Sequence, residues 1–258
     1  MNNILIKVEN LVKTFGGLVA LNDCSLEIKD KAITGIIGPN GSGKTTLFNV
    51  ITGNLKPDTG KVFYNGVEIT NEESHDLFHL GVLRTFQIAH EFSNMTVIEN
   101  LMVVPGNQKG EKLVYSLMNS QKIKKEDELI KDKAMEVLKF LKIEHLKNER
   151  AGNLSGGQKK LLELARTMMV DAKIVFLDEV GAGVNKTLLR DISDSILKLN
   201  QDKGYTFCMI EHDFNFISEL CDPVIVLAEG SVLFKGSAED VKSNEQVIES
   251  YLGKGLKK

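Results

Sequence analysis

Short apolar runs dominate the first third of the chain. Strand-like patterns lie at residues 4–8, 25–28, 33–37, 61–64 and 67–69. The last two runs flank Asn65-Gly66, a pair typical of a two-residue hairpin turn because both turn positions need a positive φ. The run 33–37 predicts a more buried strand, and it leads directly into a glycine-rich loop.

The pattern changes to a helical one between about residues 97 and 150. Apolar side chains recur there near the 3.6-residue period among many lysines and glutamates, at Leu129, Ile130, Ala134, Val137, Leu138 and Leu141. A helix with one solvated face is predicted.

Apolar strands return in the last third, at residues 174–177, 205–210 and 224–227, with helical segments between them. Short continuous apolar strands that alternate with helices indicate a parallel sheet covered on both faces. The predicted fold class is therefore α/β, and the helical middle is an insertion into that core.

Composition and charge narrow the class of protein. The chain has 258 residues, 42% of them hydrophobic, and a net charge of −3, which argues against a surface made mainly for nucleic acid. No window approaches the roughly 18 unbroken apolar residues of a membrane span. The three cysteines lack metal-ligand spacing and are typical of a reducing compartment. A cytoplasmic protein is expected.

The glycine-rich loop after residues 33–37 fits G-x-x-x-x-G-K-[ST]. Its residues are Gly38, Pro39, Asn40, Gly41, Ser42, Gly43, Lys44, Thr45 and Thr46. Glycines let successive backbone N–H groups turn inward around phosphate oxygens, and a helix that starts near Lys44 adds its positive end. Lys44 is expected to reach the β- and γ-phosphates, Thr45 to hold Mg²⁺ through its hydroxyl, and Thr46 to add a phosphate contact. The motif predicts binding of a nucleoside triphosphate.

A second motif supplies carboxylates. The apolar run 174–177 ends in Asp178 and Glu179, at the strand end where α/β sheets bind ligands. Asp178 is expected in the Mg²⁺ shell, and Glu179 as the general base that polarises the attacking water. Two adjacent acids can also cap a helix; beside a phosphate loop, the catalytic interpretation is favoured.

The segment Ser155, Gly156, Gly157 and Gln158 has the form of a capping box ahead of an apolar helix. Two glycines at a capped helix start also make it a candidate second anion site. Two phosphate-binding helix ends in one chain suggest that they face each other across a dimer.

With Leu154, this segment resembles the signature motif of ATP-binding cassette (ABC) ATPases, in the expected order between the phosphate loop and the acidic strand. The resemblance covers essentially the whole chain and implies three further site residues. Phe15 matches the aromatic that stacks on adenine, Gln87 the loop glutamine that senses Mg²⁺ and the attacking water, and His212 the switch histidine that contacts the γ-phosphate.

Within that family, the finer pattern resembles the larger ATPase subunit of branched-chain amino acid importers. The matching stretches include residues 14–21, 84–87 and 95–101. ATPases of urea or amide importers and of a lipopolysaccharide exporter are similar over part of this pattern. Val180 departs from it, because the family usually has proline after the catalytic glutamate, and Asn185 stands where many relatives have aspartate.

The resemblance implies one ABC ATPase domain over residues 1–258, with a P-loop core of RecA type at 1–88 and 157–258, an antiparallel β subdomain, and a helical subdomain at about 89–156. It implies ATP and Mg²⁺ as cofactors. The implied partners are a second ABC ATPase subunit, two transmembrane permease subunits and, indirectly, an extracytoplasmic substrate-binding protein, with no nucleic acid. The expected location is the cytoplasmic face of the membrane. A soluble ABC ATPase outside transport, and a non-catalytic nucleotide sensor, are the competing hypotheses.

Overall fold

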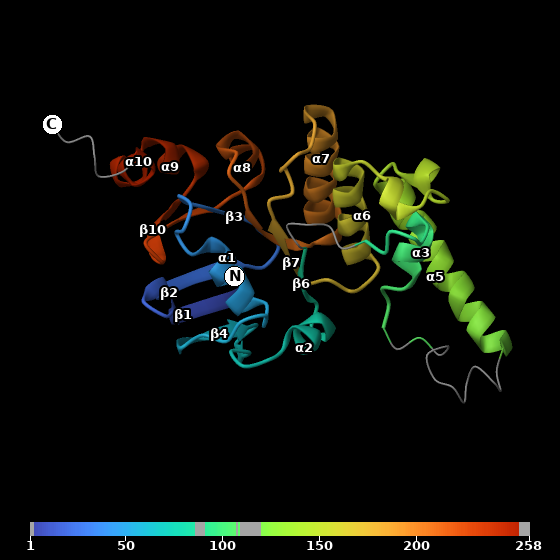
Figure 1. Ribbon diagram of the computed structural model, residues 1–258, viewed down its shortest axis with the longest axis horizontal. Coiled ribbons are helices and arrows are strands. Elements are labelled where there is room, and N and C mark those ends of the chain that lie inside the picture. The colour runs from blue at the N-terminus through green and yellow to red at the C-terminus, as the bar shows by residue number, and fades with distance from the viewer. Residues whose placement is uncertain (1–2, 86–90, 107, 109–119, 253–258) are drawn as a thin grey trace. The chain divides into compact units, whose positions relative to one another are not determined.

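The computed structural model describes residues 3–85, 91–106, 108 and 120–252 (Figure 1). The chain forms two compact units. The first unit comprises residues 1–87, 173–182 and 197–258, and the second comprises 88–172 and 183–196. The predicted division ended the helical part at 156, whereas these units group residues 157–172 with it. That the whole chain is one ABC domain stays a prediction.

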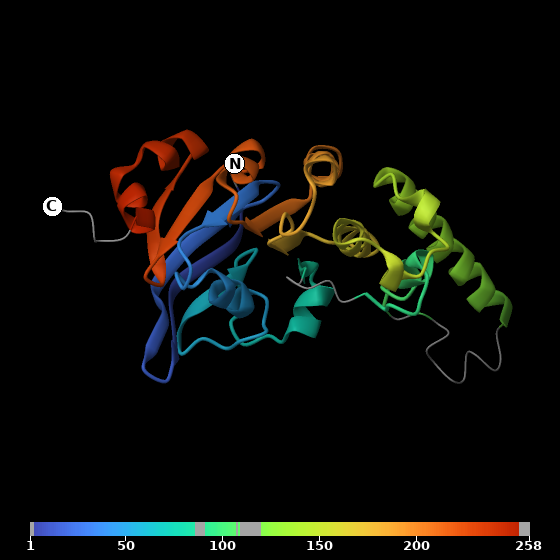
Figure 2. The same ribbon diagram turned by 45° about the horizontal axis from the view of Figure 1, so that its top comes forward.

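An antiparallel sheet of four strands begins the first unit. Its order is β2-β1-β4-β5, with β1 at Ile4–Phe15, β2 at Leu18–Lys29, β4 at Thr59–Tyr64 and β5 at Val67–Glu68. Asn65 and Gly66 join the last two strands with φ values of 48° and 81°, so the predicted hairpin is confirmed. Strands β1 and β2 pair over nearly their whole length, far beyond the predicted runs 4–8 and 25–28, and form the long hairpin of Figure 2.

A second sheet has six strands in the order β10-β9-β3-β8-β7-β6. The strands are β3 (Ile33–Ile37), β6 (Val82–Arg84), β7 (Ile174–Asp178), β8 (Thr206–Ile210), β9 (Val224–Ala228) and β10 (Ser231–Gly236). The predicted parallel pairing is confirmed for β9, β3, β8 and β7, while β6 adds a parallel edge beside β7 and β10 an antiparallel edge beside β9. Strands β6 and β10 were not predicted.

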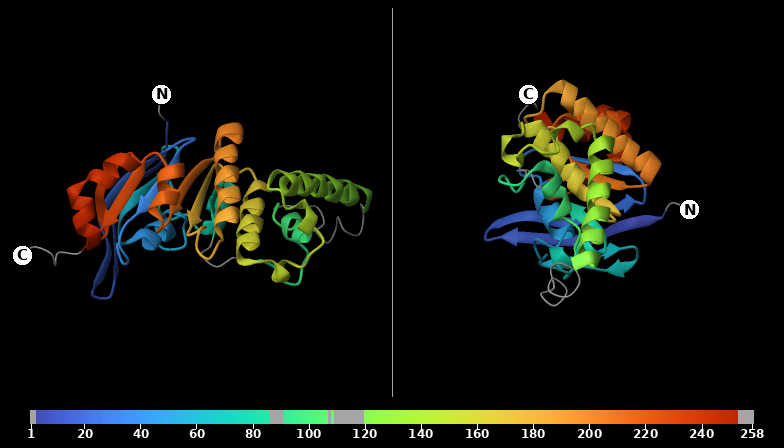
Figure 3. Two further views of the ribbon diagram at one scale, coloured as in Figure 1. Left: turned by 90° about the horizontal axis from the view of Figure 1, so that it is seen from above. Right: turned by 90° about the vertical axis from the view of Figure 1, so that its right-hand side faces the viewer.

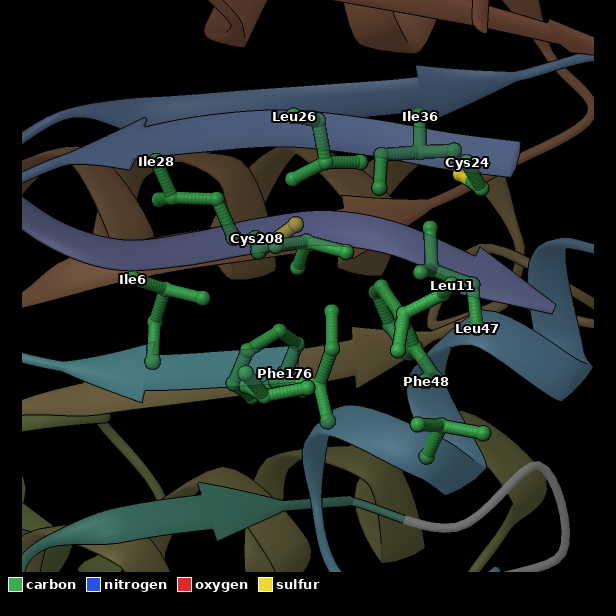
Figure 4. Packing of buried hydrophobic residues seen from close by; sticks show 14 of the residues in the cluster. Ile6, Leu11, Cys24, Leu26, Ile28, Ile36, Leu47, Phe48, Phe176 and Cys208 are labelled. Atoms are coloured by element: carbon green, nitrogen blue, oxygen red, sulfur yellow. The ribbon is translucent and has the colours of Figure 1, made fainter. Parts of the chain in front are cut away.

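Helices cover both faces of the six-stranded sheet (Figure 1). The first unit has α1 (Lys44–Ile51), α2 (Ser74–His79), α8 (Phe214–Leu220), α9 (Ala238–Ser243) and α10 (Glu245–Leu252). Helix α8 packs so closely on β3 that a Cβ at Gly35 would lie 3.0 Å from side-chain atoms of Ile217 and Cys221. On the other face, α1 and the antiparallel sheet enclose the core, where Phe48 meets Phe176 edge to face at 5.0 Å (Figure 4).

The second unit is helical. It contains α3 (Val97–Met102), α5 (Ser120–Phe140), the 3₁₀ turns η2 (Glu144–Leu146) and η3 (Ala151–Asn153), α6 (Gly156–Met168) and residues 186–196 of α7 (Lys186–Lys203). Helices α5 and α6 are in contact, and α5 runs across the direction of α6 in the left view of Figure 3. The predicted apolar face is buried at Ala134, Val137, Leu138 and Leu141. Leu129 is 63% exposed, so its assignment to that face was wrong.

Among the described residues, no helix is long and apolar enough to cross a membrane.

Candidate functional site

The glycine-rich loop lies between β3 and α1, so the predicted order of strand, loop and helix is confirmed. Gly38 and Gly43 have φ values of 154° and 98°. A Cβ at Gly38 would lie 2.1 Å from the Leu227 carbonyl oxygen, and one at Gly43 would lie 2.4 Å from that of Ala20. Both distances are far below van der Waals contact, so only glycine lets the loop pass between β9 and β2.

The loop holds the Lys44 ammonium inside itself. Lys44 is 6% exposed, and its Nζ donates to the carbonyl oxygens of Gly38 at 2.8 Å and Pro39 at 2.9 Å. Burial lowers the pKa of this ammonium, and the carboxylates of Glu179 and Asp178 act in the opposite direction. A cation held by neutral carbonyls in a low-dielectric site is well suited to exchange them for phosphate oxygens.

The rest of the predicted phosphate site divides into exposed and buried groups. Asn40, Gly41 and Thr45 are exposed, and Thr46 is half-buried. Ser42 is 2% exposed and lies 3.4 Å from Lys44 Nζ. Helix α1 has no acidic residue in its first turn, so its positive end is not offset there by a carboxylate of its own sequence.

Asp178 ends strand β7 and is 2% exposed. One of its carboxylate oxygens, Oδ2, accepts a hydrogen bond from Arg84 Nη2 at 2.7 Å. Arg84 was not singled out from the sequence, because its partner is 94 residues away. Asp178 and Thr45 offer carboxylate and hydroxyl oxygens, the donor chemistry that Mg²⁺ prefers.

Glu179 and His212 form a contact pair. Glu179 follows β7, His212 follows the neighbouring strand β8, and 3.0 Å separates Glu179 Oε1 from His212 Nε2. Their side chains are 20% and 51% exposed, so solvent reaches both groups. A carboxylate beside an imidazole at an accessible strand end can accept a proton from water.

Hydrogen bonds hold the turn after Glu179, where the resemblance predicted a proline and the chain has Val180. Glu179 has a φ of 49°, unusual for a residue with a side chain. Its backbone N–H donates to the Ile210 carbonyl at 3.0 Å, and the Gly181 N–H donates to the Glu211 carboxylate at 2.8 Å. Val180 is itself 5% exposed. The turn is therefore fixed at two points without a proline.

Glu211 is a second group that the sequence did not single out. It is 5% exposed, and burial raises the pKa of its carboxyl above the usual range, with a further rise from the nearby Glu179 carboxylate. The signal for this group in the sequence is an acidic residue between an apolar strand and a predicted catalytic histidine.

Phe15 lies at the tip of the long hairpin and is 49% exposed. It pairs with Leu18, and Ala20, which touches the phosphate loop, lies two residues, or about 7 Å, farther along β2. Asp58 fixes this end of β1: its Oδ2 accepts from the Thr14 N–H at 2.7 Å and from the Thr14 hydroxyl at 2.6 Å. An exposed aromatic near the loop has the access that stacking on a base requires.

The Ser155–Gln158 segment starts helix α6 in the second unit, and the predicted capping box is confirmed. Ser155 N donates to Gln158 Oε1 at 2.9 Å, and Gln158 N donates to Ser155 Oγ at 3.4 Å. A Cβ at Gly156 would have no atom within 4 Å, whereas one at Gly157 would lie 2.1 Å from Leu188 Cδ2. The structure thus brings together the site residues at 38–46, 178–179 and 212 in the first unit and places 155–158 in the second. Gln87 lies outside the described residues.

Comparisons with known proteins agree on one family. A family model described as ABC transporter matches residues 21–182. The chain is 43% identical to a probable branched-chain amino acid transport ATP-binding protein LivG of Archaeoglobus fulgidus, over 96% of this chain and 95% of the relative. It is 42% identical to a protein with the same description from Methanocaldococcus jannaschii, over 96% and 97%. A crystal structure of the ADP conformation of MJ1267, an ATP-binding cassette of an ABC transporter, matches with a TM-score of 0.82 and 40% identity, over 97% of this chain and 99% of that one.

Proposed function

The chain belongs to the ABC transporter family, and from this premise we propose that it is the ATP-hydrolysing subunit of an importer for branched-chain amino acids. As a member of this family it is a nucleotide-binding ATPase with the P-loop cassette fold. The observation that carries the catalytic assignment is the 3.0 Å contact between Glu179 and His212 beside a phosphate loop.

In this proposal the phosphates of ATP lie on residues 38–46. The backbone N–H groups of the loop and the positive end of α1 bind the phosphate oxygens. Lys44 leaves the carbonyls of Gly38 and Pro39, which it contacts at 2.8 and 2.9 Å, for the β- and γ-phosphates. Thr46 adds a phosphate contact, and Phe15 stacks on the adenine.

Thr45, Asp178 and Gln87 are the residues we assign to Mg²⁺. When bound, the ion neutralises charge on the β- and γ-phosphate oxygens. Thr45 supplies a hydroxyl from the start of α1, and Asp178 supplies a carboxylate from the end of β7. The assignment of Gln87 rests on the family resemblance alone.

Hydrolysis needs a general base and a group that contacts the γ-phosphate. Glu179 is the proposed base: its carboxylate accepts a proton from the attacking water and thereby raises the nucleophilicity of that water. His212 Nε2 contacts the Glu179 carboxylate at 3.0 Å, and this histidine is proposed to contact the γ-phosphate. The hydrogen bonds that Ile210 and Glu211 accept from the turn fix the position of Glu179 beside His212.

The capped helix start at Ser155, Gly156, Gly157 and Gln158 is proposed to act on the ATP of a second ABC ATPase subunit. Closing two subunits over two nucleotides couples dimerisation to hydrolysis, as lid closure does in other enzymes. Two transmembrane permease subunits would receive this motion at the cytoplasmic face of the membrane, and an extracytoplasmic substrate-binding protein would deliver the cargo.

Branched-chain amino acids are the proposed cargo because the two relatives above carry that description over nearly their full lengths. ATPases of urea or amide importers and of a lipopolysaccharide exporter are the alternatives within transport, and a soluble ABC ATPase is the alternative outside it. Uptake of labelled leucine and of labelled urea into vesicles that contain the chain with its permease subunits separates the two kinds of importer, and uptake of neither by an assembled complex would favour the exporter. Failure of the chain to co-purify with any permease would favour the soluble alternative.

The catalytic assignment is tested with Glu179→Gln, and with Glu219→Gln as the matched control because Glu219 is exposed on α8. We expect Glu179→Gln to lose ATP turnover, to keep ATP affinity, and to accumulate as an ATP-bound dimer in gel filtration. Glu219→Gln should behave like the wild type. Wild-type turnover by Glu179→Gln would refute the assignment of the base.

A further inference from the structure

Arg84 is a buried cation to which the proposed mechanism gives no role. It ends strand β6, and its side chain is 8% exposed. Its Nη2 donates to Asp178 Oδ2 at 2.7 Å, and its Nη1 donates to Asn49 Oδ1 on helix α1. One guanidinium thus joins three elements, β6, α1 and β7.

Aromatic packing also holds together the junction of β6, α1 and β7 around Arg84. The Arg84 guanidinium carbon lies 5.8 Å from the centroid of the Phe48 ring on α1, and Phe48 meets Phe176 of β7 edge to face. Phe48 and Phe176 are fully buried. Because the planar guanidinium is held by two hydrogen bonds and a ring face, its orientation is set by its surroundings and not by solvent.

The junction joins the two elements that carry the assigned Mg²⁺ donors. Thr45 lies four residues before Asn49, so the two residues share one face of α1, about one turn apart. Asp178 is the other partner of Arg84. We propose that Arg84 is a positioning residue that holds the Asp178 carboxylate in register with α1, so that Thr45 and Asp178 present their oxygens to one cation. This inference rests on the proposed function.

Two other roles for Arg84 predict different results. A cation beside a metal site repels the metal, so a purely electrostatic role predicts that removal of the positive charge tightens metal binding. A role in folding alone predicts lower thermal stability with an unchanged metal affinity. Positioning predicts weaker metal binding, because loss of a group that orients a metal ligand typically costs ten- to a hundredfold in metal affinity.

The experiment measures Mn²⁺, as a probe for Mg²⁺, binding to the complex of the full chain with ADP, with free Mn²⁺ followed by its electron paramagnetic resonance signal. ADP affinity is measured separately in EDTA. The variants are Arg84→Gln, which removes the charge, and Arg84→Lys, which keeps the charge but cannot donate to two partners in a fork. Asn49→Ala removes only the α1 anchor, and Arg190→Gln is the control at an exposed arginine of α7.

We expect Arg84→Gln to weaken Mn²⁺ binding about ten- to a hundredfold while ADP affinity in EDTA stays within about twofold. Arg84→Lys and Asn49→Ala should show smaller losses in the same direction, and Arg190→Gln none. If Arg84→Gln does not fold, Arg84→Lys decides.

Tighter or unchanged Mn²⁺ binding in a folded Arg84 variant would overturn the proposal, and so would an equal loss of ADP affinity in EDTA, because the whole loop would then have moved. A wild-type chain that binds no ADP would refute the proposed function itself, and this inference with it.

Discussion

Replacement of Ser155 by alanine separates two roles that coincide in one side chain. Ser155 Oγ accepts from the Gln158 N–H as a helix cap, and the residue is exposed. Acceptance leaves the hydroxyl hydrogen available to donate, as a phosphate contact would require. Another capping box, at Ser237 and Asp240, has a cap bond of 3.2 Å, and there the Ser237 hydroxyl also donates to Asp240 Oδ2 at 2.7 Å. Ser237→Ala therefore removes a cap without touching the proposed site.

The two roles differ in size. Loss of a serine cap costs about 0.5–2 kcal/mol and typically about 1 kcal/mol. For a domain of this size, that lowers the melting temperature by about 2–4 °C. Since domains are stable by about 5–15 kcal/mol, both variants stay almost fully folded at 25 °C. A hydrogen bond to a charged phosphate is worth about 1.5–3 kcal/mol, or about ten- to a hundredfold in rate.

The assay is ATP turnover at 25 °C alongside thermal unfolding, for the wild type, Ser155→Ala and Ser237→Ala. We expect a small loss of melting temperature for Ser155→Ala, a loss at least as large for Ser237→Ala because its hydroxyl also donates to Asp240, and a turnover loss of at least about tenfold for Ser155→Ala alone. If the turnover of the two variants agrees within twofold, Ser155 acts only as a cap, and the assignment of this helix start to a partner's ATP is wrong.

Three further predictions concern single side chains. Gly156→Ala should keep or slightly raise the melting temperature, because the new Cβ meets no atom within 4 Å. It should lower ATP turnover, because the methyl group keeps phosphate from the backbone N–H groups. Unchanged turnover would contradict a phosphate contact at this helix start. Burial raises the pKa of Glu211, so the contribution of this carboxyl to stability is complete below pH 4.5 and falls as the pH rises through the folded pKa. Urea midpoints should therefore show Glu211→Gln to be more stable than the wild type at pH 7.5, with a difference that closes toward pH 4.5. A stability difference independent of pH would refute burial as the cause. Hydrogen bonds from Lys13 and Thr14 lower the pKa of Asp58 to about 2, so the contribution of this carboxylate to stability is present above pH 3.8 and is lost as the pH falls toward 2. Asp58→Asn should be less stable than the wild type at pH 6, and the difference in stability should narrow below pH 3.8. A difference that stays constant with pH would contradict this role of the Asp58 hydrogen bonds.

Sequence patterns correctly predicted those elements whose structure is decided by neighbouring residues in the chain. Strand 33–37 has its predicted bounds because all five residues are buried on both faces of the sheet. The Asn65-Gly66 turn has the predicted positive φ values because few other residues adopt them. Strand β6, three residues long, and the edge strand β10 are set by pairing with distant strands and carry little periodicity of their own. Leu129 is exposed because, at about 100° per residue, it points well away from the face of α5 on which Ala134, Val137 and Leu138 are buried.

The same distinction between local and long-range interactions separates the site residues that were predicted from those that were not. Groups expected to touch the nucleotide lie in short motifs, because one ligand constrains several neighbouring residues at once. The groups that hold those motifs are charged residues that look like ordinary surface positions in the sequence. Arg84 reaches Asp178 over 94 residues, Asp58 reaches Thr14 over 44, and Glu211 reaches Gly181 over 30. Only the folded chain brings these partners together, and each then fixes a residue at or beside a motif. Substitutions at such supports should therefore alter turnover even though none of the three side chains is assigned a contact with the nucleotide.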